Sequence, residues 1–216
     1  MALALAERGA RLLLTGRDRG RLEEVAAACD TRDFRAADLT LDKAVAALGG
    51  LVSTVFGTLD LLILSIGVFV SGPVAATSVE DLDSAYRTNV RAPYLLTQTL
   101  LPALEKASGQ VVFVNSSVGV RARGGIGAYA ASKHALKAIA DSLRDEVDPL
   151  GVRVLSVYPG RTATPMQKEI FAREGRPWTP EHLLQPEDVA RAVLDAIALP
   201  RTAEVSDLHL RPMHRT

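Results

Sequence analysis

Two side chains that could exchange a proton stand four residues apart in the stretch GAYAASKHALKAIADSL, residues 127–143. Tyr129 precedes Lys133, and the apolar residues that follow recur at helical spacing. A helix would therefore place the phenol and the ammonium on one face. A free tyrosine has a pKa of about 10, and a neighbouring cation favours its ionised form. We expect Lys133, helped by a bound cationic group, to lower the pKa of Tyr129, so that the phenol can protonate a carbonyl oxygen or deprotonate an alcohol.

Two further residues strengthen this interpretation over its alternative, a half-buried tyrosine beside a solvated lysine. Ser116 ends the apolar run GQVVFVNSS, where its hydroxyl could hold a substrate oxygen beside the phenol. Asn89 stands four residues before Pro93 in a helical pattern. Proline has no N–H, so the carbonyl of Asn89 loses its usual partner and could hold a water that relays protons to Lys133. A bend at Pro93 without chemical role is the alternative.

Strand and helix patterns alternate along the whole chain. We expect strands at residues 11–16, 33–39, 59–67, 109–117, 152–160 and 203–212, and helices at 2–8, 18–29, 41–56, 78–108, 129–148 and 186–199, with a loop over 165–185. This alternation predicts an α/β fold, a doubly wound parallel sheet with helices on both faces, in a single domain spanning residues 1–216.

Small polar residues gather where five of the predicted strands end, in the segments TGRD, AADLT, LSIGV, NSSVG and YPGRTATP. Open parallel sheets bind ligands beyond the carboxyl ends of their strands. The sequence therefore predicts a binding site at this edge of the sheet.

The composition narrows the classes of function. The 216 residues include 25 basic and 25 acidic side chains, so the basic excess of a nucleic-acid-binding protein is missing. The longest apolar run, LLILSIGVFV, is about half a membrane span. The one cysteine, Cys29, cannot form an internal disulfide. We expect a cytoplasmic protein without a metal site, a nucleic-acid partner or a membrane segment.

Together the motifs NSS and YAASK, with LLILSIG before them and YPGRTATP after them, resemble the short-chain dehydrogenase/reductase family in order and spacing. The resemblance implies a Rossmann-like fold in which Tyr129 is the catalytic acid/base and Ser116 orients the substrate oxygen. Lys133 would bind the nicotinamide ribose and Asn89 would anchor a relay water. Ser117 adjoins Ser116, and the spacing to Tyr129 favours Ser116.

The resemblance also implies a set of cofactor contacts. The family's Asn-Asn-Ala-Gly stretch reads Leu64-Ser65-Ile66-Gly67 here, so only the glycine is kept. The implied cofactor-binding residues, besides Asn89, Tyr129 and Lys133, are Arg17, Asp38, Ser65, Gly67, Pro159, Gly160, Thr162 and Thr164. Each could instead be a turn residue or a helix cap. The family's acidic position after its second strand corresponds to Gly16, followed by Arg17, which favours NADP(H) and leaves NAD(H) possible.

One part of the family pattern has no counterpart in this sequence. The family begins with a strand and a Gly-x-x-x-Gly-x-Gly turn that cradles the pyrophosphate, whereas MALALAERGARLLLTGRD resembles the first helix followed by the second strand. That first strand is central in the family's sheet. We therefore expect its neighbours either to pair directly or to leave backbone groups unpaired.

These observations predict an NADP(H)-dependent oxidoreductase that interconverts a carbonyl and a secondary alcohol on a small-molecule substrate, as a homodimer or homotetramer. The alternatives are a non-catalytic nucleotide-binding or regulatory protein of the same fold, or an inactive fragment. A methyltransferase is disfavoured, because it typically needs an acidic residue where Gly16 and Arg17 stand. Phe171 and Trp178 would form an apolar wall of the substrate pocket or, alternatively, pack onto the domain.

Overall fold

The computed structural model describes residues 1–214 and shows alternating helices and strands. The strands are β1 (Leu14–Gly16), β2 (Phe34–Ala36), β3 (Leu61–Leu64), β4 (Gln110–Val114), β5 (Arg153–Pro159) and β6 (Asp207–Leu210). The helices are α1 (Ala2–Ala6), α2 (Arg19–Ala28), α3 (Asp42–Val55), α4 (Val79–Tyr86), α5 (Ala92–Ala107), α6 (Gly127–Val147), α7 (Pro165–Arg173) and α8 (Pro186–Ile197). Each predicted strand and helix is present, and the α/β class is confirmed.

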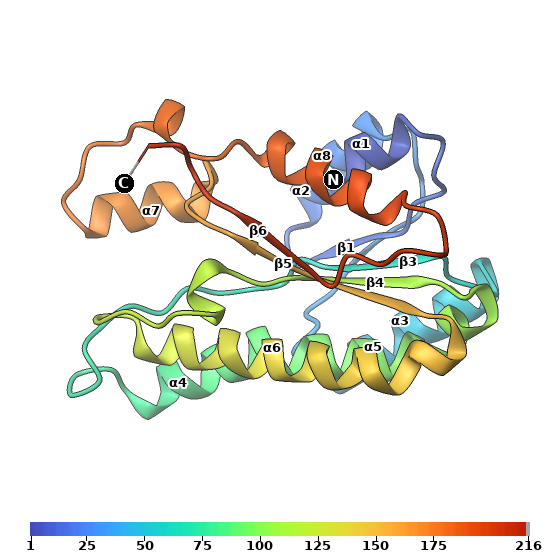
Figure 1. The fold of residues 1–216 in the computed structure, drawn as a ribbon, viewed down its shortest axis with the longest axis horizontal. Helices are drawn as coiled ribbons and strands as arrows, with labels where there is room; N and C mark the ends of the chain where they lie inside the picture. The colour runs from blue at the N-terminus through green and yellow to red at the C-terminus, as the bar shows by residue number, and fades with distance from the viewer. Residues whose placement is uncertain (215–216) are drawn as a thin grey trace.

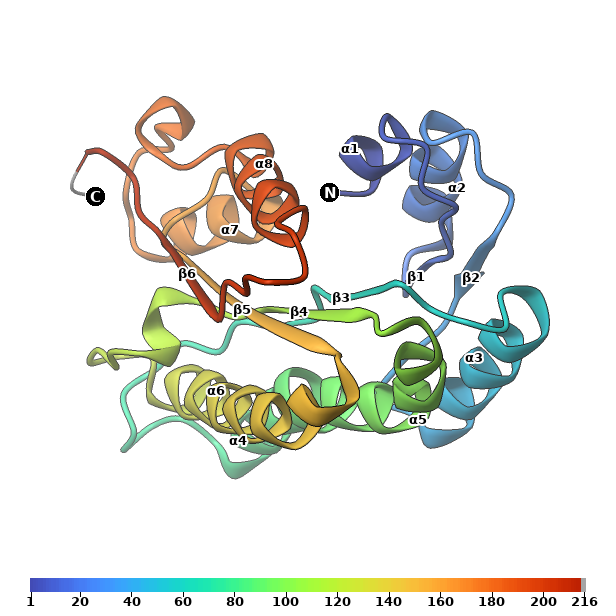
Figure 2. The same cartoon turned by 45° about the vertical axis from the view of Figure 1, so that its right-hand side comes forward.

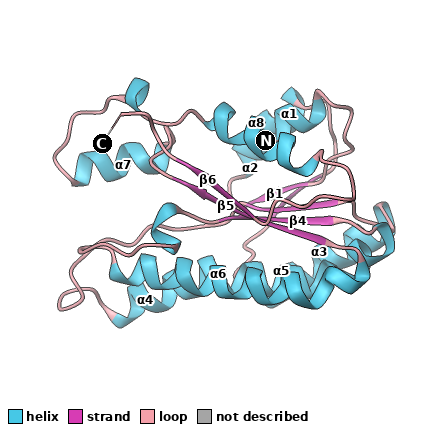
Figure 3. Ribbon diagram, in the orientation of Figure 1, coloured by secondary structure: helices cyan, strands magenta, loops and turns pink. Residues whose placement is uncertain are grey.

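The strands lie between two layers of helices (Figures 1 and 3), with α3, α4, α5 and α6 on one face and α1, α2, α7 and α8 on the other. Side chains alternate between the two faces along a strand. Val111 and Phe113 of β4 therefore pack into the cluster formed with α3, α5 and α6, while Val112 packs with Val189 and Val193 of α8. Because helices cover both faces of the strands, the strand sequences are continuous apolar runs.

All strand pairs are parallel, but the strands form two sheets rather than one. One sheet contains β1 and β2, and the other has the order β3-β4-β5-β6. Within residues 1–214, β1 pairs only with β2 and β3 pairs only with β4. The first of these sheets stands to one side of the second in Figure 2. From the sequence we expected the neighbours of the missing strand either to pair directly or to leave backbone groups unpaired. Those neighbours are β1 and β3, and they do not pair directly.

The helix predicted over residues 78–108 is interrupted. Ser78 caps its start by accepting a hydrogen bond from the backbone N–H of Asp81. After α4 the chain widens into a π-helical turn, Arg87–Arg91, before α5 begins. Pro93 accounts for the change, because it cannot supply the N–H that an α-helix requires at that position.

The loop predicted over residues 165–185 was wrong, because it contains α7 and a short 3₁₀ turn at Pro180–His182. Thr164 caps α7 by accepting from the backbone N–H of Gln167, and Pro165 occupies the first helical position, where proline is favoured. The ends of the segment are joined by a bridge between Thr162 and Leu184. Within residues 1–214, no helix is long and apolar enough to span a membrane.

Candidate active site

Tyr129 and Lys133 lie on the same side of α6, as their spacing predicts. The Nζ of Lys133 is 6.0 Å from the centroid of the Tyr129 ring and donates a hydrogen bond to the carbonyl of Val114 at 3.2 Å. Lys133 is buried, with 3% of its surface exposed, while Tyr129 is half-buried. The ring of Phe69 meets that of Tyr129 edge-on, with 5.0 Å between centroids. The phenol therefore has an apolar ring on one side and a buried cation beside it.

The direction of the Tyr129 pKa differs from the prediction. Burial raises the pKa of Tyr129, and a hydrogen bond from the Ser116 side chain opposes this only in part. Burial also lowers the pKa of Lys133, to about 8. Lys133 alone therefore does not lower the pKa of Tyr129 in the free chain, whereas the prediction also counted on the charge of a bound cationic nicotinamide. The physical reason is that desolvation of the phenolate outweighs the favourable interactions around it, and Lys133 bonds to Val114 rather than to the phenol.

Ser116 reaches the Tyr129 hydroxyl from the end of β4. Its Oγ also caps the 3₁₀ turn Ser117–Gly119, where it accepts from the backbone N–H of Val118 at 3.4 Å. Ser117 lies within this turn, one residue further from the strand. Between the two candidate serines, it is Ser116 that the structure brings to the phenol.

Asn115 is a buried polar residue that the sequence analysis missed. Its Oδ1 accepts from the backbone N–H of Ser116 at 2.9 Å, and its Nδ2 donates to the carbonyl of Lys133 at 3.1 Å. Asn115 therefore ties the end of β4 to the first turns of α6. A Cβ on Gly119 would lie 2.5 Å from the Asn115 Oδ1, so this contact requires a glycine there. The signal was the asparagine that directly precedes Ser116 in the NSS motif.

Asn89 lies in the π-helical turn and is fully buried. Its side-chain amide bonds to both backbone groups of Val68, accepting from the N–H at 2.8 Å and donating to the carbonyl at 3.0 Å. The same Nδ2 donates to the Oγ of Ser132 at 2.9 Å. The side chain thus has protein partners at both ends. Any water held by Asn89 must therefore use its backbone carbonyl, to which Pro93 can offer no N–H.

Gly67 lies where these groups converge. A Cβ on Gly67 would come within 3.4 Å of the Asn89 Oδ1 and within 3.7 Å of the Lys133 Nζ. The loop after β3, the π-helical turn and α6 therefore meet at one point, although they are distant in the sequence.

A cleft of about 200 Å³ opens beyond the carboxyl ends of β1, β2 and β3. It brings together four of the predicted cofactor-binding residues, Arg17, Asp38, Ser65 and Gly67. It is also lined by Thr15, Gly16, Ala37, Leu39, Thr40, Ile66 and Thr88. The sequence analysis did not single out Thr15, Thr40 and Thr88, because a hydroxyl side chain has no characteristic spacing in a sequence.

Asp38 keeps its charge in this cleft. Thr40 donates to its Oδ1 from both the hydroxyl, at 2.7 Å, and the backbone N–H, at 3.0 Å. These two bonds and the charge of Arg17 hold the pKa of Asp38 below its usual value. The cleft thus offers a cation, a carboxylate and several hydroxyls. This donor and acceptor set fits the adenosine end of a nicotinamide dinucleotide.

The remaining predicted cofactor residues are Pro159, which ends β5, and Gly160, Thr162 and Thr164, which follow it; none of these lines the cleft. Thr162 donates to the carbonyl of Gly160 at 3.1 Å, and the hydroxyl of Thr164 caps α7. Gly160 donates its N–H to the carbonyl of Leu210, the last residue of β6. These residues therefore have the structural roles that the sequence left as the alternative, although the Thr164 O–H, which is not used by the cap, can still donate to a ligand.

Phe171 packs onto the domain instead of lining an open pocket. It is buried, with 1% of its surface exposed, and its ring meets Trp178 edge-on at 5.4 Å. The guanidinium groups of Arg161 and Arg176 lie 5.0 and 4.8 Å from its centroid. Arg161 also donates to Glu174 at 2.8 Å. The segment after β5 thus holds its own small cluster around Phe171.

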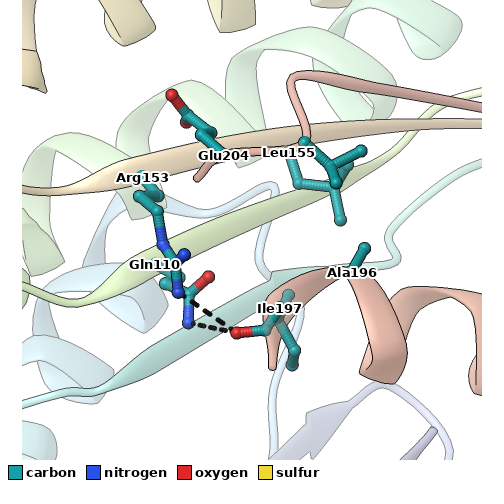
Figure 4. Close-up of a pocket in the computed structure, with 7 residues that line it drawn as sticks. Gln110, Arg153, Leu155, Ala196, Ile197 and Glu204 are labelled. Carbon is teal, nitrogen blue, oxygen red and sulfur yellow. Dashed lines mark hydrogen bonds between the residues drawn. The ribbon is translucent and has the colours of Figure 1, made fainter. Parts of the chain in front are cut away.

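A second cavity, of only about 10 Å³, lies at the opposite end of the strands (Figure 4). Gln110 and Arg153 begin β4 and β5 there, and both donate to the carbonyl of Ile197 at the end of α8. Arg153 also donates to the carbonyls of Leu199, Pro200 and Ala203. The space holds about one water molecule, so this is a structural joint. Within residues 1–214, no cluster of three or more His, Cys, Asp or Glu side chains could hold a metal ion.

Comparison with known proteins agrees with this geometry. The sequence model of the short chain dehydrogenase family matches residues 1–175, and the chain belongs to that family. A relative from Staphylococcus aureus, named an uncharacterized oxidoreductase, is 30% identical over 216 residues, which cover 99% of this chain and 91% of the relative. The chain is thus an oxidoreductase of the short chain dehydrogenase family.

Two solved structures extend the comparison to bound cofactors. A short chain dehydrogenase from Shigella flexneri, complexed with NADP, is 28% identical with a TM-score of 0.89, covering 97% of this chain and 89% of that chain. A short chain dehydrogenase from Escherichia coli, complexed with NADPH, is 29% identical with a TM-score of 0.87, covering 96% and 89%. Both likenesses support a nicotinamide cofactor.

Proposed function

We propose that this chain interconverts a carbonyl and a secondary alcohol, with NADP(H) as cofactor and Tyr129 as the proton donor and acceptor. The observation that carries the proposal is the convergence of Ser116, Tyr129 and Lys133. The side chain of Ser116 lies close enough to the phenol to oppose the rise of its pKa, and the buried ammonium lies 6.0 Å from the ring centroid. These groups come from the segment just after β4 and from α6, and the Lys133 Nζ lies within 3.7 Å of a Cβ built on Gly67.

Each residue has a defined task in this proposal. Because the pKa of Tyr129 is raised, the phenol carries its proton at neutral pH and can donate it to a carbonyl oxygen. Ser116 holds that oxygen beside the phenol by hydrogen bonding. The buried ammonium of Lys133 stabilises the phenolate that remains after proton transfer. When bound, the dinucleotide supplies or accepts the hydride that balances this proton.

The preference for NADP(H) rests on Arg17. Its side chain is exposed at the rim of the cleft, where the sequence offers Gly16 in place of an acidic residue. A guanidinium there suits the additional phosphate, whereas a carboxylate would suit the free ribose hydroxyl of NAD. The NADP and NADPH in the two similar structures support the same choice.

The test is replacement of Tyr129 by Phe, with Tyr94→Phe as the matched control because Tyr94 is exposed on α5. Turnover would be assayed with NADPH and a panel of aldehydes and ketones, and NADPH binding by fluorescence. Y129F should lose about 10²–10⁴-fold in turnover and keep NADPH binding, while Y94F should match the unmodified chain. Full turnover in Y129F would contradict the assignment.

A second candidate, a nucleotide-binding protein without catalysis, is favoured by the separation of β1 from β3. Residues following both strands line the cleft, so this separation is expected to weaken the hold on a dinucleotide. Binding of NADPH without turnover on any carbonyl of the panel would select this candidate over the enzyme.

A further inference from the structure

Ser132 connects Asn89 in the π-helical turn with Tyr129 in α6, two residues of the candidate site that are far apart in the sequence. It is fully buried in α6, one residue before Lys133. Its hydroxyl accepts from the Asn89 Nδ2 at 2.9 Å and donates to the carbonyl of Tyr129 at 2.7 Å. Both bonds are short and well within normal hydrogen-bond distance.

The inference depends on the bond between Asn89 and Ser132. A serine inside a helix commonly bonds to a carbonyl three or four residues earlier, and the bond to Tyr129 has that ordinary form. The bond from Asn89 is different, because it comes from 43 residues away and is also buried. Asn89 in turn holds both backbone groups of Val68. A continuous chain of hydrogen bonds therefore runs from the loop after β3, through the π-helical turn, to the backbone of Tyr129.

Other contacts also hold α6 near this point, but none replaces that chain. Asn115 ties the carbonyl of Lys133 to β4, and Lys133 bonds to Val114 of the same strand. Both of these contacts connect α6 to β4. Among the hydrogen bonds described above, the pair made by Ser132 is the one that connects α6 to the loop containing Gly67 and Val68.

We propose that Ser132 is a positioning residue that fixes Tyr129 and Lys133 relative to the loop at Gly67. This inference rests on the proposed function, because it assigns Ser132 to the same reaction. Replacing Ser132 by Ala removes the acceptor for the Asn89 amide and leaves a buried N–H unpaired. Asn89 must then shift or break its bonds to Val68, and the first turn of α6 loses its tie to the loop. A small misplacement of a reacting group is enough to reduce catalysis strongly.

The experiment compares Ser132→Ala with Ser142→Ala. Ser142 lies on the same helix and donates to Glu146 at an exposed position, so it controls for loss of a serine from α6. Measured quantities are kcat, the KM for a carbonyl substrate, the NADPH dissociation constant, the pH profile of kcat and the melting temperature. S132A should lower kcat about ten- to a hundredfold, shift the pH profile, and change KM and NADPH binding by less than about threefold. S142A should leave all of these unchanged.

The outcomes separate this inference from the function on which it rests. If the unmodified chain turns over no carbonyl, the proposed function fails first. If it turns over and folded S132A keeps its kcat and pH profile, the positioning role is overturned, whatever happens to the melting temperature. If circular dichroism shows that S132A does not fold, Ser132→Cys decides by the same criteria, since a thiol keeps the shape but bonds weakly.

Discussion

The ammonium of Lys133 lies beside the ring of Tyr129 and bonds to the carbonyl of Val114 instead of the phenol. The distance from Nζ to the ring centroid is 6.0 Å, and both groups are sheltered from water. Desolvation therefore disfavours both the phenolate and the ammonium in the free chain. In the proposed function, the positive charge of an oxidised nicotinamide bound beside them would favour the phenolate and so help Tyr129 to accept a proton from an alcohol.

Replacement of Lys133 by Met should remove a pH-dependent part of the stability. Burial lowers the pKa of Lys133 to about 8, whereas a lysine in an unfolded chain has a pKa of about 10.4. Between these values the unfolded state binds more protons, so the contribution of this group to the free energy of unfolding increases as the pH rises. Below about pH 8 this contribution is constant and unfavourable to the fold.

Urea unfolding of the unmodified chain and of K133M between about pH 7 and 10 tests this directly. The difference in free energy of unfolding should shift in favour of the unmodified chain across the upper part of that range. Lys168→Met, on the exposed surface of α7, is the control and should show a constant difference. Parallel curves for K133M and the unmodified chain would show that Lys133 titrates normally.

Replacement of Arg17 by Ala should change cofactor preference. Loss of a charged partner for phosphate typically weakens binding by about tenfold or more, so NADPH affinity should fall while NADH affinity changes little. Arg19→Ala is the control, because Arg19 is exposed nearby and paired with Glu23. Isothermal titration with both cofactors measures the effect, and equal losses for NADPH and NADH would refute a phosphate-specific role for Arg17.

The sequence predicted the parts of this site that depend on periodicity. Tyr129 and Lys133 share a face because four residues make about one helical turn, and that relation holds whatever packs against the helix. The same reasoning could not predict the bonds of Asn89, because its partners Val68 and Ser132 are distant in the chain. Contacts between segments depend on the packing of whole elements, which a linear pattern does not contain.

Predictions also failed where a short element depends on one cap. Residues 165–185 contain three prolines, Pro165, Pro177 and Pro180, and this composition favours a loop. The structure nevertheless forms α7, because Thr164 caps it and Phe171 buries its ring among Arg161, Arg176 and Trp178. The stabilising contacts come from tertiary packing, which overrides local preference.

Replacement of Arg161 by Met should loosen α7. Its guanidinium covers Phe171 and donates to Glu174, which lies just after the helix, so it is a main tie between α7 and the end of β5. A partly buried ion pair with a cation–π contact is worth about 1 kcal/mol, which corresponds to about fivefold faster amide exchange. Hydrogen exchange in residues 165–173 measures this.

The control for that experiment is Arg176→Met, because Arg176 also covers Phe171 but makes a longer contact with Glu174, 3.4 Å against 2.8 Å for Arg161. It should have a smaller effect on the exchange of α7. If R161M leaves exchange in α7 unchanged, Arg161 does not hold this helix to β5.

A methyl group at Gly119 should disturb the site, whereas one at Gly50 should stabilise the fold. A Cβ at Gly119 would lie 2.5 Å from the Asn115 Oδ1, so Gly119→Ala should cost about 1–3 kcal/mol and reduce turnover. Gly50 lies inside α3 with open space around it, so Gly50→Ala should gain about 0.5–1 kcal/mol. Thermal unfolding of both variants measures the difference, and a neutral G119A would mean that Asn115 can move aside without loss.

Replacement of Arg153 by Met should destabilise the joint between α8 and β5. Arg153 donates to four backbone carbonyls, those of Ile197, Leu199, Pro200 and Ala203. Leaving these partners without a charged donor should cost about 2 kcal/mol. Arg201→Met, which loses one bond to Gly151, is the control and should cost less. Equal melting temperatures for R153M and R201M would contradict this role.

The π-helical turn at Arg87–Arg91 makes this part of the chain intolerant of insertions and deletions. Each residue of an α-helix turns the following side chains by about 100°, and the wider turn lets α4 contact α6 while α5 contacts α3. Removing any single residue there would swing the apolar stripe of α5 away from α3 and carry Asn89 out of reach of Val68. A change of one residue in the length of this stretch would therefore separate the two halves of the candidate site, even if Asn89 and Pro93 were both kept.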